Sequence, residues 1–283
     1  MFSAFSFPSS NRTVMPIPPK TKRVLTIAGS DSGGGAGIQA DLKTFSAFGV
    51  YGLSVITALT AQNTVRVYGV EPVSPDFVGL QFEAVITDIG ADAVKTGMLF
   101  SAETIDVVAL KLHQNRIAHV VCDPVMVAKS GDKLLEDNAI HTLKERLAPE
   151  VSILTPNIPE AEVLSGLPIH SAEALKEAAL RIHGFGCGAV LIKGGHLRGG
   201  ADDILYDGER FIRYSQKRIE TLHTHGTGCT YSAAIAANLA KGFELAEAVR
   251  IAKAFVTEAI RTARPLGKGH GPLNHFVRTV DSE

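Results

Sequence analysis

Short apolar runs alternate with longer amphipathic segments along most of this chain. The runs at residues 24–28, 93–96, 119–122, 151–154 and 189–193 have the length of strands and lack the polar alternation of a half-exposed strand. Helical patterns of ten or more residues separate several of them. This order is typical of βαβ units, and the unbroken apolar strands predict a largely parallel sheet that is covered on both faces.

The other expected elements complete this α/β architecture. We expect further extended segments at residues 54–59 and 70–73, and helices at residues 36–48, 75–88, 101–115 and 138–147. Asp207-Gly208 separates the apolar runs 204–206 and 211–214, which predicts a hairpin and hence an antiparallel ribbon that joins the sheet late. A last helix carries one apolar stripe, formed by Ala248, Ile251, Ala252, Phe255, Val256, Ala259 and Ile260.

Residues 21–283 are expected to form one domain. We find no linker or internal repeat between residues 23 and 275, and the length suits a single large α/β domain. Residues 1–20 differ, because they are rich in Ser, Pro and Phe and contain no acidic residue. They lack the continuous apolar core of a secretory signal, so we expect a disordered or extension segment, with a short transit peptide as the alternative.

Charge and cysteine content exclude several classes of protein. The formal net charge is −1, which gives no electrostatic reason to bind nucleic acid or an anionic membrane. No apolar run has the roughly 18 residues that a membrane helix needs. Three cysteines, Cys122, Cys187 and Cys229, are an odd and sparse set without the spacing of a metal site. We therefore expect a cytoplasmic protein from a reducing compartment.

The segment from His225 to Thr230 has the sequence His-Gly-Thr-Gly-Cys-Thr and opens a helix that is expected to stop near Gly242. A glycine turn at a helix start presents unpaired N–H groups at the positive end of the helix dipole, which favours an anion. The same position is expected to lower the pKa of the Cys229 thiol. The alternative interpretation is a plain turn with a buried cysteine.

A second glycine cluster, at residues 29–37, follows the first strand and opens the first helix. Gly35, Gly37 and Ala40 satisfy the dinucleotide fingerprint, but the second strand ends at Asn63 without the acidic residue that binds the ribose. A hydride-transfer enzyme is therefore a poor second choice. Asp41 follows in the first turns of the helix, where it either compensates the dipole or binds a ligand. The chain contains no Walker A sequence.

Polar side chains also follow two later strands. Asn157 and Glu160 lie at a strand–helix junction, where an amide and a carboxylate could orient a hydrated Mg²⁺. On these residues alone, an N-cap with a first-turn acid is the better explanation. Lys193 ends another strand and is expected to point into the crevice where α/β proteins bind ligands; a lysine at the rim is the alternative.

The order of these motifs resembles the ribokinase-like superfamily of small-molecule kinases, and most closely its hydroxymethylpyrimidine branch in the thiamine pathway. The resemblance rests on residues 28–31, 37–45, 57–64, 95–99, 123–126, 129–131, 155–157, 225–230 and 267–272. It extends over about residues 23–276 and leaves residues 1–20 outside. It implies a three-layer α/β/α fold and a kinase that phosphorylates 4-amino-5-hydroxymethyl-2-methylpyrimidine and then its monophosphate, with ATP and Mg²⁺ as cofactors.

The resemblance also assigns roles to residues. The pyrimidine pocket would use Gly29, Asp41, Gln62, Met98 and Val125. Nucleotide binding would use Asn157, Lys193, Thr224, Gly226 and Thr227, with Mg²⁺ held by Glu160 and, through water, by Asn157. Gly226 and Gly228 would form the anion hole together with Cys229, which stands where the wider superfamily carries an aspartate base. Because the loose transition state of phosphoryl transfer needs little help from a base, we expect the anion hole to matter more than the thiol.

Several further expectations stay open. Residues 129–131 would form a lid over the substrate. A homodimer is expected, with no nucleic acid and no membrane as partner. A pyridoxal kinase on the same fold is the nearest alternative function, and a non-catalytic pyrimidine sensor is the alternative from another class.

Overall fold

The computed structural model describes residues 21–126, 138–194 and 201–277. Within these residues the strands form one sheet in the order β3-β2-β1-β4-β5-β6-β7-β8-β9. Its parallel part consists of β1 (Arg23–Asp31), β2 (Tyr51–Gln62), β4 (Ala93–Thr96), β5 (Val120–Cys122), β6 (Ile153–Leu154) and β7 (Val190–Ile192). Antiparallel strands flank it, with β3 (Val67–Pro72) on one side and β8 (Asp203–Tyr206) and β9 (Phe211–Tyr214) on the other. The predicted parallel sheet with a late antiparallel ribbon is confirmed.

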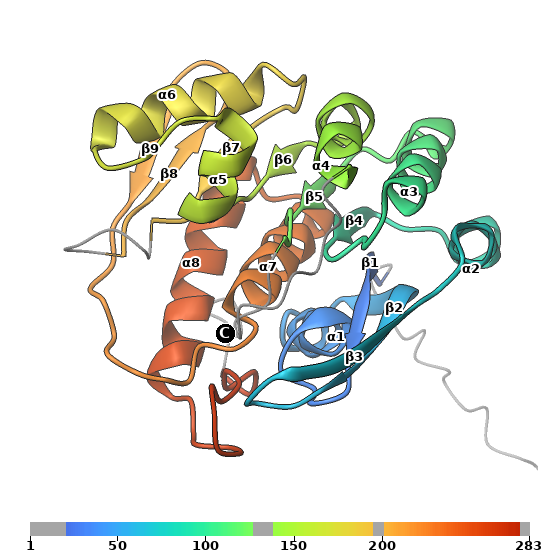
Figure 1. Cartoon of the computed structure of the whole chain (residues 1–283), viewed down its shortest axis with the longest axis horizontal. Coiled ribbons are helices and arrows are strands. Elements are labelled where there is room, and N and C mark those ends of the chain that lie inside the picture. The colour runs from blue at the N-terminus through green and yellow to red at the C-terminus, as the bar shows by residue number, and fades with distance from the viewer. Residues whose placement is uncertain (1–20, 127–137, 195–200, 278–283) are drawn as a thin grey trace, which may run out of the picture.

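Helices cover both faces of this sheet and give three layers (Figure 1). One face packs against α1 (Gly37–Ala47), α7 (Thr227–Lys241) and α8 (Leu245–Arg261). The other packs against α2 (Pro75–Asp88), α3 (Ala102–Asn115), α4 (Ala139–Thr142), α5 (Ile158–Ser165) and α6 (Ala172–His183). Successive side chains of a strand point to opposite faces, so Val120 belongs to one apolar core and Val121 to the other. This explains the unbroken apolar strands of the sequence.

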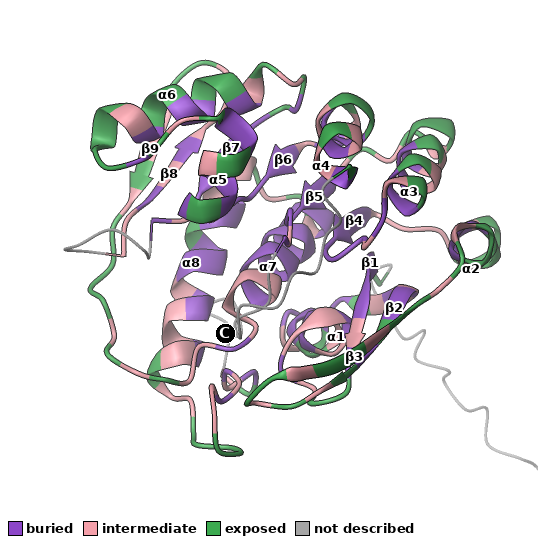
Figure 2. Cartoon of the chain, in the orientation of Figure 1, coloured by how far each residue is buried: buried purple, intermediate pink, exposed green. Residues whose placement is uncertain are grey.

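The helix α7 is buried along nearly its whole length, as Figure 2 shows. It begins after Gly226 and ends at Gly242, which have φ values of 80° and 93°. Glycine adopts this left-handed conformation without steric cost, which explains why the predicted start and end of the helix are confirmed. The mostly small side chains between them let α7 pack closely between the sheet and α8.

The amphipathic stripe of α8 is also confirmed. Its residues Ala248, Ile251, Ala252, Phe255, Val256 and Ala259 are buried, whereas Ile260 is half-buried. None of the helices that the structure describes is both long enough and apolar enough to cross a membrane.

The structure differs from the expected elements at four places. The strand expected at residues 54–59 extends over Tyr51–Gln62, because its start pairs with β1 and its second half pairs antiparallel with β3. The helix expected at residues 138–147 is α4 followed by a wider π-type turn at Leu143–Leu147. Neither α6 nor the pairing of β3 with β2 was expected from the sequence.

Candidate active site

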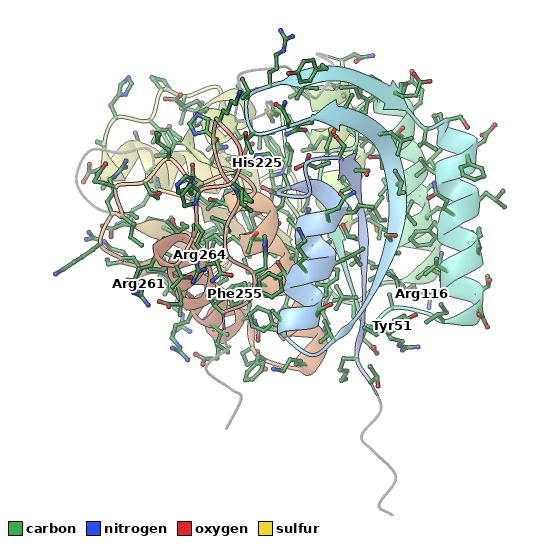
Figure 3. The ribbon with its side chains drawn as sticks, turned by 90° about the horizontal axis from the view of Figure 1, so that it is seen from below. Tyr51, Arg116, His225, Phe255, Arg261 and Arg264 are labelled. Carbon is green, nitrogen blue, oxygen red and sulfur yellow. The ribbon has the colours of Figure 1, made fainter. Side chains whose placement is uncertain are left out.

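A cavity of about 940 Å³ opens where the parallel strands end. Its wall includes the last residues of β1 and β2, Asp31 and Gln62, and the residues that directly follow β5 and β7, Asp123 and Lys193. Open α/β sheets bind ligands at these strand ends. Figure 3 shows His225, which lines this cavity, on the opposite side of the molecule from Tyr51 at the start of β2. Twelve of the residues expected at the site line this one cavity: Gly29, Gln62, Met98, Val125, Asn157, Glu160, Lys193, Thr224, Gly226, Thr227, Gly228 and Cys229.

The expected anion loop forms the start of α7. A side chain at Gly226 would place its Cβ 1.8 Å from the carbonyl oxygen of Gly35, so the anion loop packs directly on the first glycine cluster. A Cβ at Gly228 would lie 3.0 Å from Oδ2 of Asp123 and 3.3 Å from Nζ of Lys193. The first N–H groups of a helix have no partner one turn earlier. This helix start therefore offers N–H donors beside a lysine, which suits the phosphate groups of a ligand.

The expected low pKa of Cys229 is wrong. Burial raises the pKa of this thiol to about 11, and the carboxylates of Asp41 and Asp123 add to the effect of burial. The positive charge of Lys95 lowers the pKa, but not enough to compensate. The net effect is opposite to the one expected from a helix start, and the thiol is protonated at neutral pH.

Lys193 is held in place by Asp123. Its Nζ lies 2.6 Å from Oδ1 of Asp123, and both side chains are largely buried. Sequence reasoning quoted Asp123 in a motif but gave it no role. The signal was present, because this acid directly follows a strand of the same sheet edge as Lys193.

Asn157 and Glu160 form a capping box at the start of α5. The backbone N–H of Asn157 donates to Oε2 of Glu160 at 2.8 Å, and the N–H of Glu160 donates to Oδ1 of Asn157 at 3.0 Å. The N-cap interpretation is thus confirmed as local geometry. Burial raises the pKa of Glu160 to about 7, with Lys193 lowering it and the charge of Asp123 raising it further.

Asp123 and Glu160 are candidate ligands for a divalent cation that keeps most of its water shell. In the described part of the chain, no group of three His, Cys, Asp or Glu side chains could hold a metal ion. Mg²⁺, however, keeps several waters and takes one or two carboxylates together with the phosphates of a substrate. Asp123 and Glu160 fit that requirement. Burial is the main cause of the raised pKa of Glu160, and a bound cation would offset the smaller contribution from the charge of Asp123.

The end of the cavity near β1 has apolar walls. Met98 is buried beside Gly29, where an added Cβ would lie 3.2 Å from Met98 Sδ. Val125 packs against the same small apolar group. Gln62, the last residue of β2, brings a carboxamide to this region. Such a pocket suits a flat ring with a few polar edges.

Asp41, also expected in this pocket, lies behind its wall. It is fully buried and pairs with Lys95, whose Nζ is 2.8 Å from Oδ2 and which itself lines the cavity. Thr26 donates a second hydrogen bond to the same oxygen at 2.6 Å. The other oxygen, Oδ1, has no hydrogen-bond partner among the described residues. Burial lowers the pKa of Lys95, but the Asp41 carboxylate more than offsets this, so the pKa is raised.

Asp31 connects the two glycine segments, and sequence reasoning did not assign it a role. Its carboxylate accepts backbone N–H groups from Gly33, Gly35 and Ala36 at 2.8 to 3.0 Å. Nε2 of His225 lies 2.8 Å from Oδ2 of the same carboxylate.

The lid expected at residues 129–131 lies outside the described residues.

Comparison with known proteins identifies the family of this chain. The family model described as phosphomethylpyrimidine kinase matches residues 31–274. This chain belongs to the phosphomethylpyrimidine kinase family. The site residues discussed above lie within the matched segment, apart from Gly29.

Two relatives of this family member and one solved structure illustrate the range of similarity. A hydroxymethylpyrimidine/phosphomethylpyrimidine kinase of Bacillus subtilis is 49% identical over 90% of this chain and 95% of its own length. A thiamine biosynthesis bifunctional protein of Geobacter sulfurreducens is 57% identical over 91% of this chain, which spans only 53% of that protein. The structure of an ADP complex of Bacillus subtilis pyridoxal kinase is 42% identical, with a TM-score of 0.84 over 90% of this chain and 97% of that one. The expected ribokinase-like fold is confirmed.

Proposed function

We propose that this protein transfers a phosphoryl group from ATP to 4-amino-5-hydroxymethyl-2-methylpyrimidine and then to the resulting monophosphate, as a step of thiamine biosynthesis. The observation that carries the proposal is that one cavity joins an apolar pocket with Gln62 to an anion loop beside Lys193. The activity named for the Bacillus subtilis relative supports the acceptor, and the ADP complex of the pyridoxal kinase supports the nucleotide.

In this proposal the protein positions the reactants and stabilises charge. The N–H groups around Gly226 and Gly228 bind the transferring phosphoryl group, and Lys193, anchored by Asp123, neutralises its charge. Mg²⁺, held by Glu160 and Asp123 and through water by Asn157, would supply further charge neutralisation. Asn157, Thr224 and Thr227 complete the nucleotide site. Met98, Val125 and Gly29 enclose the pyrimidine ring, and Gln62 binds its polar edge.

Cys229 has a smaller role than the anion loop. A thiol with a pKa of about 11 is protonated at neutral pH and cannot remove the proton of the substrate hydroxyl efficiently. A loose transition state tolerates this, because little bond to the acceptor oxygen has formed when the bond to the leaving group breaks, so the hydroxyl proton is not yet acidic.

Product analysis tests the proposal. The full chain is incubated with Mg-ATP and the pyrimidine alcohol, and the monophosphate and diphosphate are measured by mass spectrometry together with ADP. We expect both products, with Gln62→Ala raising KM by about tenfold because one hydrogen-bonded edge of the ring is lost. ADP that fails to appear when the pyrimidine is added would instead support a non-catalytic sensor.

A pyridoxal kinase is the second candidate, because the solved pyridoxal kinase is similar over nearly the whole chain. Both acceptors carry a hydroxymethyl group on a flat six-membered ring. Comparing kcat/KM for the pyrimidine alcohol and pyridoxal decides between them. A larger value for pyridoxal would overturn the first proposal.

We further propose that residues 21–283 form one kinase domain beyond an extension at residues 1–20, that the protein is cytoplasmic, and that it forms a homodimer. One continuous sheet supports the single domain. All three cysteines are free thiols, as expected in a reducing compartment. Exposed apolar side chains at Leu59 and Tyr68 on β2 and β3 offer a surface for a second copy. Light scattering coupled to size exclusion measures the mass and tests the dimer.

A further inference from the structure

The starting observation is the way in which the backbone of Lys193 is held. The N–H of Lys193 donates to the carbonyl of Pro156 at 2.9 Å. The next N–H along the chain, that of Gly194, donates to Oδ1 of Asp203 at 2.9 Å. These two N–H groups belong to the peptide planes on either side of the Lys193 Cα. Because each peptide group is planar, two fixed planes also fix φ and ψ of Lys193, and hence the direction in which its side chain leaves the backbone.

The second of these contacts is not part of the sheet ladder. Gly194 lies beyond the end of β7 at Ile192, and the acceptor of its N–H is a side chain at the start of β8. The two segments are in backbone contact there, since a Cβ on Gly194 would lie 1.6 Å from the carbonyl oxygen of Asp202. The position of the Gly194 peptide therefore depends directly on the start of β8.

Asp203 is itself held by Lys253 on α8. Nζ of Lys253 lies 2.6 Å from Oδ2 of Asp203 and donates to the carbonyl of Ala201 at 2.7 Å. The side chains of Asp203 and Lys253 are only 2% and 10% exposed, so each charge needs the other as its counter-charge. Each oxygen of Asp203 has a partner inside the protein, which favours an effect through Gly194 over direct contact with a ligand.

We propose that Asp203 is a positioning residue for Lys193, because it holds the peptide plane that directs the lysine side chain toward the anion loop. Lys253 keeps the Asp203 carboxylate in place. Asp123 holds the other end of the Lys193 side chain, so the lysine is fixed at both ends. The effect on phosphoryl transfer rests on the proposed function, whereas the hydrogen bond between Gly194 and Asp203 does not.

The hydrogen bond is tested without catalysis, by amide hydrogen exchange of the full chain measured by NMR. We expect the Gly194 N–H of the wild type to exchange about 100-fold more slowly than an unprotected amide, because it is buried and hydrogen-bonded. A Gly194 N–H that exchanges at the unprotected rate would overturn the proposal, whatever the enzyme phosphorylates.

Two double variants separate this hydrogen bond from the ion pair. Asp203→Asn with Lys253→Met keeps an acceptor for the Gly194 N–H, and Asp203→Leu with Lys253→Met removes it. Neither leaves a buried charge unpaired, so both are expected to fold, and thermal unfolding verifies this. Asp203→Ala with Lys253→Met also lacks the acceptor and replaces the second variant if the leucine does not fit.

Steady-state kinetics use Mg-ATP with the pyrimidine alcohol or pyridoxal, whichever gives the larger kcat/KM. Asp203→Asn with Lys253→Met should keep kcat within about threefold of wild type. Asp203→Leu with Lys253→Met should lower kcat about tenfold at nearly unchanged KM for the acceptor, because a misplaced ammonium stabilises the transferring group less well. Equal kcat values in the two double variants, whether high or low, would overturn the proposal. A raised KM for Mg-ATP at unchanged kcat would place Asp203 against the nucleotide and overturn it as well.

The effect should also depend on the lysine. In a Lys193→Met background the difference in kcat between the two double variants should disappear, because no ammonium remains to be positioned. A difference that persists in full would overturn the proposal, since Asp203 would then act on something other than Lys193.

Arg23→Met with Asp92→Leu is the matched control. Asp92 likewise pairs with a cation and accepts a backbone N–H, both from Arg23, at 3.0 and 2.8 Å. This pair lies at the start of β1, whereas the cavity lies at the end of that strand. We expect the control to keep the kcat of the wild type, and an equal drop there would overturn the proposal in favour of a general loss of rigidity. Absence of phosphorylation by the wild type with both alcohols would contradict the proposed function and leave the exchange of the Gly194 N–H to decide the role of Asp203.

Discussion

Nζ of Lys193, at the end of β7, lies 2.6 Å from Oδ1 of Asp123, at the end of β5, directly below the first turn of α7. Two strand ends and a helix start thus place one cation, one anion and a set of N–H donors within a few ångströms. A charge-assisted pair of this kind fixes a flexible lysine in one position. The pair is therefore the structural basis of the proposed phosphate site.

Asp123→Asn should lower kcat by about 100-fold, because Lys193 loses its anchor and the proposed Mg²⁺ site loses a carboxylate. Steady-state kinetics at saturating ATP measure this, with thermal unfolding to verify that the fold persists. Asp106→Asn is the control, since this exposed acid pairs with Arg146 at 3.2 Å on the surface. Turnover within about threefold of wild type in Asp123→Asn would contradict the anchoring role.

The raised pKa of Glu160 predicts that activity depends on pH near neutrality. Burial and the nearby Asp123 charge raise the pKa of Glu160 to about 7, so below that pH it is protonated and cannot help to hold a cation. We expect kcat/KM for Mg-ATP to rise as the pH increases through about 7. Glu160→Gln should lose this rise, while Glu173→Gln, on the exposed surface of α6, should keep it. A wild-type profile that is flat between pH 6 and 8 would refute the assignment.

The same shift has a consequence for stability. The pKa of Glu160 is higher in the folded state than its ordinary value of 4.5, so the folded state binds more protons between these values. The stabilisation is complete below pH 4.5 and is lost as the pH rises through about 7. Urea unfolding at several pH values should show that Glu160→Gln removes this part of the pH dependence.

The sequence predicted the architecture well where local signals were strong. Ser74 and Ser101 cap α2 and α3, because serine is a favoured N-cap, and Gly242 ends α7. Prediction from the sequence failed where pairing between distant segments decides how far a strand extends. β2 runs on to Gln62 because β3 pairs with it, and no local pattern contains that information.

For the site, the sequence indicated which residues meet but not their electrostatic state. The order of motifs predicted that Gln62, Asn157, Lys193 and Gly226 share one site, and all four line the same cavity. The pKa of Cys229 depends on burial by segments far apart in the chain, and its position at a helix start alone predicts a lowered pKa where the structure raises it. The interactions of Asp31 with His225, 194 residues apart, likewise exist only in the folded chain.

The buried pair Lys95–Asp41 should be important for folding. Both side chains are fully buried, so Lys95→Met leaves the Asp41 carboxylate without its counter-charge. Breaking such a pair costs about 3–5 kcal/mol of unfolding free energy. Lys95→Met combined with Asp41→Leu should regain much of this loss, because no charge then remains buried. Arg181→Met, which removes an exposed pair with Glu177 on α6, is the control and should leave the urea midpoint nearly unchanged. Equal losses in the single and double variants would contradict this account.

The reactivity of Cys229 distinguishes a thiol from a thiolate. With a pKa of about 11, roughly one thiol in a thousand is ionised at pH 8, so iodoacetamide should alkylate Cys229 far more slowly than a free cysteine. Cys229→Ser provides the background, since Cys122 and Cys187 are buried and burial raises the pKa of each to about 12. We expect Cys229→Ala to lower kcat by no more than about tenfold, because the anion loop keeps its N–H donors when the side chain is removed. A wild-type rate that rises with an apparent pKa near 8.5 and loses that rise in Cys229→Ala would instead establish the thiolate as the base.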